Sequence, residues 1–592
     1  MLTYKAPSRD IQFVTDELLN ARTHYASLKG CELAADDLRS AILDSAAQFA
    51  EEVVAPLNHS GDQEGCHFDN GKVTTPKGFK EAFHQYGDGG WQALNIPIAD
   101  GGQGLPPSVG VAVGEMMGSA NWSWSMYCGL SQAPVTCLLA AGTAEQKKFW
   151  LPKLLTLQWA GTMCLTEAHC GSDVGLLKTK AQKQSDGTYK ITGTKIFISS
   201  GEHDMTENII HTVLARLEGA PEGTAGISLF IVPKILVNAD NSLGKANAVT
   251  CGAIEHKMGI KASSTCVMNF DGATGYLLGE ENKGLKIMFA MMNQARLGTG
   301  MQGVSLAEAA YQGSLKYAKE RLQMRALSGA KNPKGPADAI IEHPDVRRML
   351  LTQKSIVEGS RAFLYWLTFL MDITEYGSDE EEKKSANDTL SLLTPVAKAF
   401  CTETAFESVN LGLQIFGGHG YISENGMEQL VRDTRISMVY EGTTGIQALD
   451  LLGRKVMGTG GELLRKFTKQ IYKFCEANKN DPAMQEFIEP LSALNKEWGD
   501  ASMKIGERVT KNLDEIGAAS VDFTMYSGYI VLAYMWAQMA KVALPKQTND
   551  FYLTKIQTAR FYYQRVLPRT KAHHAMMLAG MDTMMAVEQK NF

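Results

Sequence analysis

The chain has 592 residues, which indicates several folded units because single domains usually contain about 100–200 residues. Its composition, 44% hydrophobic and 21% charged with 56 Gly and 18 Pro, is typical of a globular protein and excludes a collagen-like, low-complexity or wholly disordered chain. A net charge of -6 gives no basic surface, so we expect neither nucleic acid nor an anionic membrane surface as a partner.

The ten cysteines include no CxxC pair and no His/Cys cluster at zinc spacing, which indicates reduced intracellular thiols and no metal site. The N-terminus lacks the apolar core of a signal peptide and the Arg/Ser-rich pattern of a transit sequence. Residues 116–144 and 523–540 are uncharged but contain polar side chains, so we expect buried helices and no integral membrane segment. These patterns predict a cytoplasmic protein.

In chain order, an N-terminal extension (1–37) precedes a predicted helical domain (38–160). There, apolar residues recur at helical spacing before Pro56, which we expect to end its helix. Residues 161–280 change to short β-branched runs, and Asp186-Gly187 predicts a hairpin turn, so we expect a middle domain with an antiparallel sheet.

The helical period returns in 281–455, a predicted helical bundle, and continues through a C-terminal helical extension (456–592). The polar segments 328–336 and 377–384 are expected to be exposed loops. The fold class is therefore predicted to be α+β, mainly α. Two stripes of the extension are expected to form core or subunit contacts rather than a cofactor site. They are Tyr529, Leu532, Ala533, Trp536 and Met539, and Met576, Met577, Met581, Met584 and Met585.

Several common catalytic motifs are absent from the sequence, namely GxxxxGK[ST], HExxH and GxSxG. One GxGxxG match, residues 298–303, lies in a helical block with no strand before it, so we interpret it as chance. Without these motifs, the sequence gives no support for a nucleoside triphosphatase, a zinc protease, a serine hydrolase or a dinucleotide-binding fold.

Three distant groups of segments carry the positive signal: Met163–Asp173 with Lys195–Gly201, Gln414–Tyr421, and Val431–Asp433 with Val439–Gln447. Together, over about residues 40–455, they resemble the acyl-CoA dehydrogenase family. The resemblance implies a helical domain, a middle β domain and a helical bundle. It also implies FAD as cofactor, an acyl-CoA substrate and electron transfer to electron-transferring flavoprotein. The extension resembles that of long family members, which implies a homodimer.

Glu441 matches the family's catalytic base. An α-proton of a thioester is weakly acidic, so a carboxylate must be held against Cα, and desolvation should raise its pKa. The alternative is that Glu441 merely precedes a helix capped by Thr443 or Thr444. By the resemblance, Tyr440 and Gly442 lie on the substrate side, and Thr443 contacts the flavin.

Four residues of the middle segment match flavin-side positions. Thr166 corresponds to a hydrogen-bond partner of the isoalloxazine ring. Ser172 corresponds to a contact near the flavin and the CoA phosphates, so it is expected to bind both the cofactor and the substrate. Phe197 stands where many members have Trp beside the flavin, and Ser199 stands at a common Thr position near N5. The alternative is a Thr/Ser-rich strand with Phe197 in the core.

The remaining matches concern charge and the FAD adenosine. Arg321 matches the arginine that meets the FAD diphosphate from the neighbouring subunit, whereas on a helix surface it would be a solvated charge. Gln414, Gly417 and Gly418 match the loop that receives the adenosine half. Arg296 matches a substrate-side arginine near the base, and its alternative is a buried ion-pair partner.

The leading hypothesis is an FAD-dependent oxidoreductase that converts acyl-CoA thioesters to trans-2-enoyl-CoA in fatty acid β-oxidation, with medium to long chains expected. The alternatives are a 3-methylmercaptopropionyl-CoA dehydrogenase, an acyl-CoA oxidase, and a DNA- or CoA-ester-binding flavoprotein without turnover. The acidic balance and the lack of a basic C-terminal tail disfavour DNA binding. Residues 122–127, rich in bulky side chains, are expected near the floor of the acyl pocket.

Overall fold

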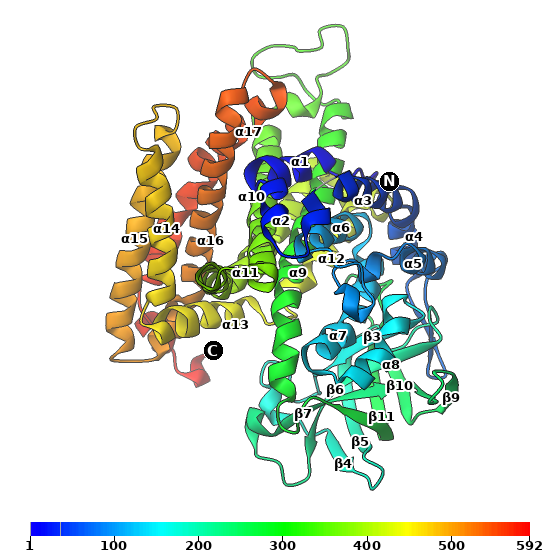
Figure 1. The fold of residues 1–592 in the computed structure, drawn as a ribbon. Helices are drawn as coiled ribbons and strands as arrows, with labels where there is room; N and C mark the ends of the chain where they lie inside the picture. The colour runs from blue at the N-terminus through cyan, green and yellow to red at the C-terminus, as the bar shows by residue number, and fades with distance from the viewer. Residues whose placement is uncertain (1, 36) are drawn as a thin grey trace. The chain divides into compact units, whose positions relative to one another are not determined.

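A computed structural model describes residues 2–35 and 37–592. Met1 and Asp36, both inside the predicted N-terminal extension, lie outside the described residues. The chain forms two compact units. Unit 1 comprises Met1–Leu43 and Arg296–Phe592, and unit 2 comprises Asp44–Ala295. Helices predominate and the strands are concentrated in unit 2, which confirms the predicted α+β, mainly α, class (Figure 1).

Unit 2 begins with helices and a small hairpin. Their starts follow local sequence: Asn121 caps α7 by accepting from the N–H of Trp124 at 3.1 Å, and Thr143 opens α8 with a capping box. Pro56 does not end the helical path as expected; it occupies the first position of α4, where its missing N–H costs no hydrogen bond. The elements are α3 Asp37–Phe49, which starts in unit 1, α4 Pro56–Glu64, β1 His67–Asp69, β2 Lys72–Thr74, α5 Phe79–Asp88, α6 Pro107–Ala120, α7 Trp122–Ala141 and α8 Ala144–Leu155.

A seven-stranded sheet follows in unit 2, with order β10-β11-β5-β4-β6-β3 and β7 pairing with β11 and β6. The expected hairpin turn at Asp186-Gly187 joins β4 to β5. The sheet is mixed, however, because β6 pairs in parallel with β3 and β4. The strands are β3 Trp159–Cys164, β4 Lys180–Lys183, β5 Tyr189–Ser199, β6 Asn208–Leu217, β7 Ile227–Pro233, β10 Val249–Ile254 and β11 Thr265–Leu278; β8 Ile235–Val237 and β9 Leu243–Ala246 form a separate hairpin.

The sheet is covered on both faces. β6 and β7 are buried along nearly their whole length, with no alternation of exposed residues. One cluster of buried side chains packs α7 and α8 on the sheet, and a second cluster fills the other face with residues such as Phe230 and Phe270. The sheet therefore holds β5, on which two predicted site residues lie, as a fixed platform.

The bundle of unit 1 is formed by α9 Gly284–Glu320, which starts in unit 2, α10 Pro344–Tyr376, α11 Glu380–Phe416, α12 Met427–Arg435 and α13 Thr444–Leu449. The N-terminal α1 Ser8–Gln12 and α2 Ala21–Ser27 belong to the same unit. The segment 377–384 was expected to be a loop, but most of it is the start of α11. Asp379 caps this helix, and three glutamates fill its first turn, where their negative charges interact favourably with the helix dipole. The other polar segment, 328–336, is an exposed loop before α10.

The extension adds α14 Glu462–Asn478, α15 Gln485–Val509, α16 Asp514–Ala543, α17 Asp550–Phe561, α18 Thr570–Met577 and α19 Asp582–Met585 (Figure 1). Of the described residues, only 514–546 form a helix long and apolar enough to cross a membrane, and 67% of its apolar window is buried in the protein. The first expected stripe is core: Trp536, for example, is fully buried and donates to the carbonyl of Ser355 in α10 at 3.0 Å. In the second stripe, Met577 is buried, whereas Met576, Met584 and Met585 are exposed.

Candidate active site

Glu441 lies in a strained turn of unit 1, between α12 and α13. Its φ is +56°, and the φ of the next residue, Gly442, is +83°. Glycine adopts this left-handed conformation freely, whereas a residue with a Cβ is strained there by about 1–2 kcal/mol. Such strain persists only where the surrounding structure over-determines the backbone, and it concentrates at functional sites.

Hydrogen bonds from two helices hold this turn. The Gln447 side chain of α13 donates to the carbonyl of Glu441 at 2.9 Å, and the Lys398 ammonium of α11 donates to the carbonyl of Gly442 at 2.6 Å. Thr443 caps α13 by accepting from the N–H of Ile446 at 3.2 Å, so of the two caps considered for this helix, Thr443 is the one observed.

The flanking residues are tied as well. The Tyr440 hydroxyl donates to the Gln302 side chain of α9 at 2.6 Å, and the Thr444 hydroxyl donates to the Glu403 carboxylate of α11 at 2.6 Å. The backbone from 440 to 444 is therefore fixed from α9, α11 and α13. A turn held from three helices can present its carboxylate in one orientation.

The charges around Glu441 oppose the effect of burial. Burial raises the pKa of its carboxyl above the ordinary value, while the positive charges of Arg296 and Lys398 act to lower it. Arg296 forms an ion pair with Asp450 at 3.2 Å, as the alternative interpretation of this arginine expected. The proximity of both cations to Glu441 also fits the substrate-side role, so the two interpretations of Arg296 are compatible.

In unit 2, the platform around Phe197 is the second candidate region. β5 carries a β-bulge there: two residues, 196 and 197, face one residue of β11. Phe197 has φ +58° and the residue is 59% exposed, so it does not lie in the core as the alternative proposed. Ser199 ends the strand and is half-buried. A bulge commonly re-aims a side chain beside a functional site.

Thr166 lies next to this bulge, because its carbonyl accepts from the N–H of Ile196 at 2.9 Å. The chain then folds back: a Cβ added to Gly171 would lie 3.6 Å from the Thr166 methyl group. The following residue, Ser172, is exposed. Thr166, Phe197 and Ser199 thus share one region of unit 2, with Ser172 beside it.

The anchor of this region was not predicted from the sequence. The buried Glu167 carboxylate accepts from the Lys195 ammonium at 2.8 Å and from the N–H and hydroxyl of Thr179. Burial raises the pKa of Glu167, but Lys195 and these donors outweigh it and hold the pKa at about 2. Ligand atoms of Glu167, His169 and Cys170 lie within 4.8 Å of one another, yet the Glu167 oxygens already accept these hydrogen bonds, so the cluster fits a structural role.

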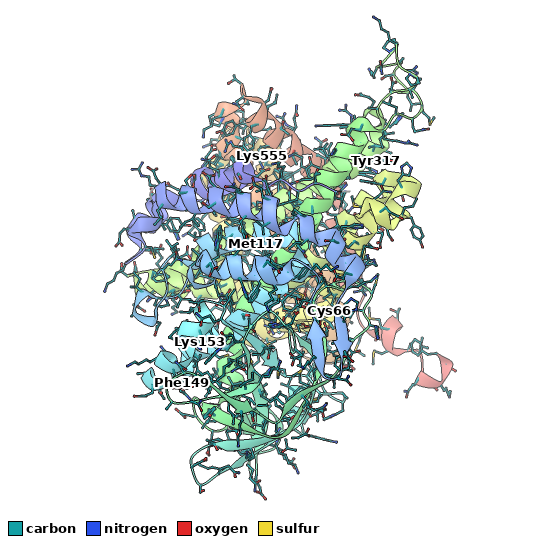
Figure 2. The ribbon with its side chains drawn as sticks, turned by 90° about the vertical axis from the view of Figure 1, so that its right-hand side faces the viewer. Cys66, Met117, Phe149, Lys153, Tyr317 and Lys555 are labelled. Carbon is teal, nitrogen blue, oxygen red and sulfur yellow. The ribbon has the colours of Figure 1, made fainter. Side chains whose placement is uncertain are left out.

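In unit 1, the residues expected to meet the FAD adenosine and diphosphate also gather. Tyr317, on the last turns of α9, stacks on Phe416 at the end of α11 with ring centroids 4.2 Å apart. Arg321 follows one turn later and is exposed, and Gly417 and Gly418 follow Phe416 directly. Gln414, on the last turn of α11, is exposed too. Figure 2 shows Tyr317 at the foot of the loop that follows α9.

These surfaces fit FAD. A planar ring can stack on an exposed aromatic side chain such as Phe197, with hydroxyl groups of Thr166 and Ser199 nearby. Around Gly417 and Gly418, an added Cβ would meet nothing within 4 Å in the described structure, which leaves room for a ligand at the backbone. The Arg321 guanidinium makes no hydrogen bond with the part of the chain that the structure describes, so its donors are available to a diphosphate.

Four family models match the chain. They are the N-terminal, middle and C-terminal domains of acyl-CoA dehydrogenase at residues 36–158, 162–273 and 282–457, and an acetyl-CoA dehydrogenase C-terminal-like domain at 467–588. A 3-methylmercaptopropionyl-CoA dehydrogenase of Ruegeria pomeroyi is 42% identical, with 99% of each chain covered. A butyryl-CoA dehydrogenase of Syntrophomonas wolfei is 37% identical, with 95% of each chain covered.

Solved structures agree on the fold. An acyl-CoA dehydrogenase from Bacillus anthracis, solved with FAD, superposes with a TM-score of 0.75 at 23% identity, covering 94% of this chain and 89% of that one. The sequence relatives cover nearly the full length of both proteins, extension included. The chain therefore belongs to the acyl-CoA dehydrogenase family of FAD-dependent oxidoreductases.

Proposed function

We propose that this protein removes one hydrogen from Cα and one from Cβ of an acyl-CoA thioester, with Glu441 as the base. The observation that carries the proposal is the turn at Glu441: a carboxylate with a raised pKa is held there in a left-handed conformation from three helices. A base works best when its pKa approaches the operating pH, and burial moves Glu441 in that direction. A mere helix-capping role would not require the strain.

In this mechanism, the Glu441 carboxylate accepts the Cα proton. No acceptor among the described residues bonds the backbone N–H of Glu441, so this donor is free to hold the thioester oxygen as negative charge develops there. Tyr440 and Gly442 flank the acyl group, and Arg296 supplies positive charge on the same side. FAD, held by the residues named below, would supply the acceptor for the hydride from Cβ.

We assign FAD binding to Thr166, Phe197, Ser199 and Thr443 on the ring side. Arg321, Gln414, Gly417 and Gly418 would take the diphosphate and adenosine of an FAD whose ring is bound by a second copy of the chain, as the family resemblance implies. A homodimer is therefore part of the proposal. Ser172 would contact the CoA phosphates.

The second part of the proposal concerns which acyl chain the enzyme accepts. The full-length relative named for 3-methylmercaptopropionyl-CoA favours a short thioether chain over the medium to long chain expected from sequence. Residues 122–127 do not decide between them, because Trp124 and Tyr127 are fully buried and bonded inside unit 2. We further propose electron transfer to electron-transferring flavoprotein and a cytoplasmic location.

Anaerobic mixing of the purified holoprotein with acyl-CoAs tests this proposal. The panel is butyryl-, octanoyl-, palmitoyl- and 3-methylmercaptopropionyl-CoA, and the readout is bleaching of the oxidised flavin band. We expect bleaching with at least one ester, fastest with the thioether. No bleaching by any ester that binds would leave a CoA-ester-binding flavoprotein. Rapid recolouring in air, producing hydrogen peroxide with each turnover, would identify an oxidase.

A further inference from the structure

Lys398 is a lysine inside the buried part of α11. Its neighbours in sequence are apolar and buried, namely Val396, Ala397, Ala399 and Phe400, and its own side chain has no exposed surface. A buried ammonium group is unfavourable unless it is paired or hydrogen-bonded. Its acceptor is the carbonyl of Gly442, 2.6 Å away, so the side chain spans from α11 to the turn that carries Glu441.

The hydrogen bond from Lys398 reaches the backbone at its strained pair of residues. Glu441 and Gly442 are both left-handed, and only the second is a glycine. The two carbonyls of this pair accept from two different helices: that of Glu441 from Gln447, and that of Gly442 from Lys398. Without a donor at the second carbonyl, the peptide that follows Gly442 could rotate, and the strained pair of left-handed residues could relax.

The charge of Lys398 is also directed at this turn. Arg296, the other cation that acts on Glu441, also forms an ion pair with Asp450. Lys398 forms no ion pair with the described part of the chain, and the charged groups that act on it are Glu441, Glu403 and Arg296. Burial lowers its pKa to about 8, with Glu441 and Glu403 acting against that effect.

We propose that Lys398 is a positioning residue for the reaction: by binding the carbonyl of Gly442, its ammonium group fixes the left-handed turn that presents the Glu441 carboxylate, and its positive charge favours the ionised form of that carboxylate. This inference rests on the proposed role of Glu441 as the base. It predicts that loss of Lys398 changes both the rate of proton removal and its pH dependence.

Two substitutions separate the hydrogen bond from the charge. Lys398→Met removes both with little change in volume, and Lys398→Gln keeps an amide donor but no charge. Lys384→Met, an exposed lysine on the same helix, is the matched control. Flavin reduction is followed by stopped flow from pH 5 to 9 in FAD-loaded protein, and hydrogen exchange is followed in the peptide that covers 439–446.

We expect Lys398→Met to lower the rate of flavin reduction about 10- to 100-fold at pH 7, the scale of a displaced catalytic group. The acidic limb of its pH–rate profile should move to higher pH, because the protonated form of Glu441 becomes more stable when the nearby cation is lost. Exchange in 439–446 should become faster. Lys398→Gln should lose less rate but show the same movement of the limb, and Lys384→Met should match the wild type.

A wild-type rate, limb and exchange pattern in Lys398→Met would overturn the inference. If Lys398→Met does not fold, Lys398→Gln decides: an unmoved acidic limb overturns the inference, and failure of both variants to fold makes Lys398 a core residue, which also overturns it. The proposed function fails separately, if wild-type protein is not reduced by any acyl-CoA or if Glu441→Gln is reduced at the wild-type rate.

Discussion

Replacing Asp10 with asparagine is expected to weaken the attachment of the N-terminal helix α1 to the rest of unit 1. Asp10 lies on α1 and pairs with Lys555 of α17, and Lys555 also donates to Glu358 of α10 at 2.8 Å. The Lys555 side chain is only 2% exposed. One ammonium group therefore joins the start of the chain, the bundle and the C-terminal extension; Figure 2 labels Lys555 beside the N-terminal helices.

The size of the effect follows from the charges around Asp10. Burial would raise its pKa, but the charges of Lys555, Arg361 and Lys354 outweigh burial and lower the pKa from 3.8 to about 2. Each pKa unit corresponds to about 1.4 kcal/mol of differential stability. The ionised carboxylate thus contributes about 2 kcal/mol to the free energy of unfolding, and asparagine should lose most of it.

The assay is urea denaturation at saturating FAD, with the unfolding midpoint followed by tryptophan fluorescence. Because the folded pKa is depressed, the contribution of Asp10 is fully present above about pH 4 and is lost only as the pH falls through the folded value. The difference between wild type and Asp10→Asn should therefore stay constant from pH 8 to 5. Asp388→Asn, whose partner Lys466 is 45% exposed, is the control and should change stability by less than about 1 kcal/mol. An unchanged midpoint for Asp10→Asn at pH 7 would refute the reasoning.

Three further outcomes are expected. Glu441→Gln should keep FAD but reduce the flavin at least about 10³-fold more slowly, since an amide cannot accept the α-proton. In the wild type, the rate of flavin reduction should rise with pH through a pKa above the ordinary carboxyl value. A near wild-type rate in the variant would remove Glu441 from its role. Arg321→Ala should weaken FAD retention by about 1.5–3 kcal/mol, measured as the FAD content of dialysed protein, and a variant that stays fully loaded would contradict the assignment. Full-length protein should be a dimer by light scattering, whereas a chain ending near Lys455 lacks α16 and should aggregate or form a higher oligomer; a soluble, active truncated dimer would contradict this.

Much of the architecture could be predicted because it depends on side-chain periodicity. The change from helical spacing to β-branched runs and back follows the order of elements observed. The stripe with Trp536 was predictable as core because its spacing matches one helix face. The parallel pairing of β3 with β6 was not predictable, because strand direction depends on the long connection between them, residues 165–207, rather than on residues within either strand.

Local charge and backbone chemistry account for the other differences. The acidic run 380–382 resembles a loop by composition, but a cap at Asp379 and the helix dipole make it the first turn of α11. The role of Lys398 could have been suspected from a lone charge between Val396 and Phe400 in an otherwise apolar helical run. Its acceptor, the carbonyl of Gly442, is 44 residues away in sequence, so only the folded chain identifies what the charge does.

Glu441 and Phe197 illustrate why site geometry is the hardest feature to predict. Both carry a Cβ and both adopt positive φ, a combination that local preference disfavours for any residue other than glycine, asparagine or aspartate. In each unit the surroundings impose the conformation: a bulge in β5 exposes Phe197, and bonds from α11 and α13 hold the turn of Glu441. Motif spacing could select these two residues, but the strain that aims their side chains arises from contacts between elements far apart in the sequence. The tertiary contacts around a motif are therefore where substitutions should alter the reaction without touching the motif itself.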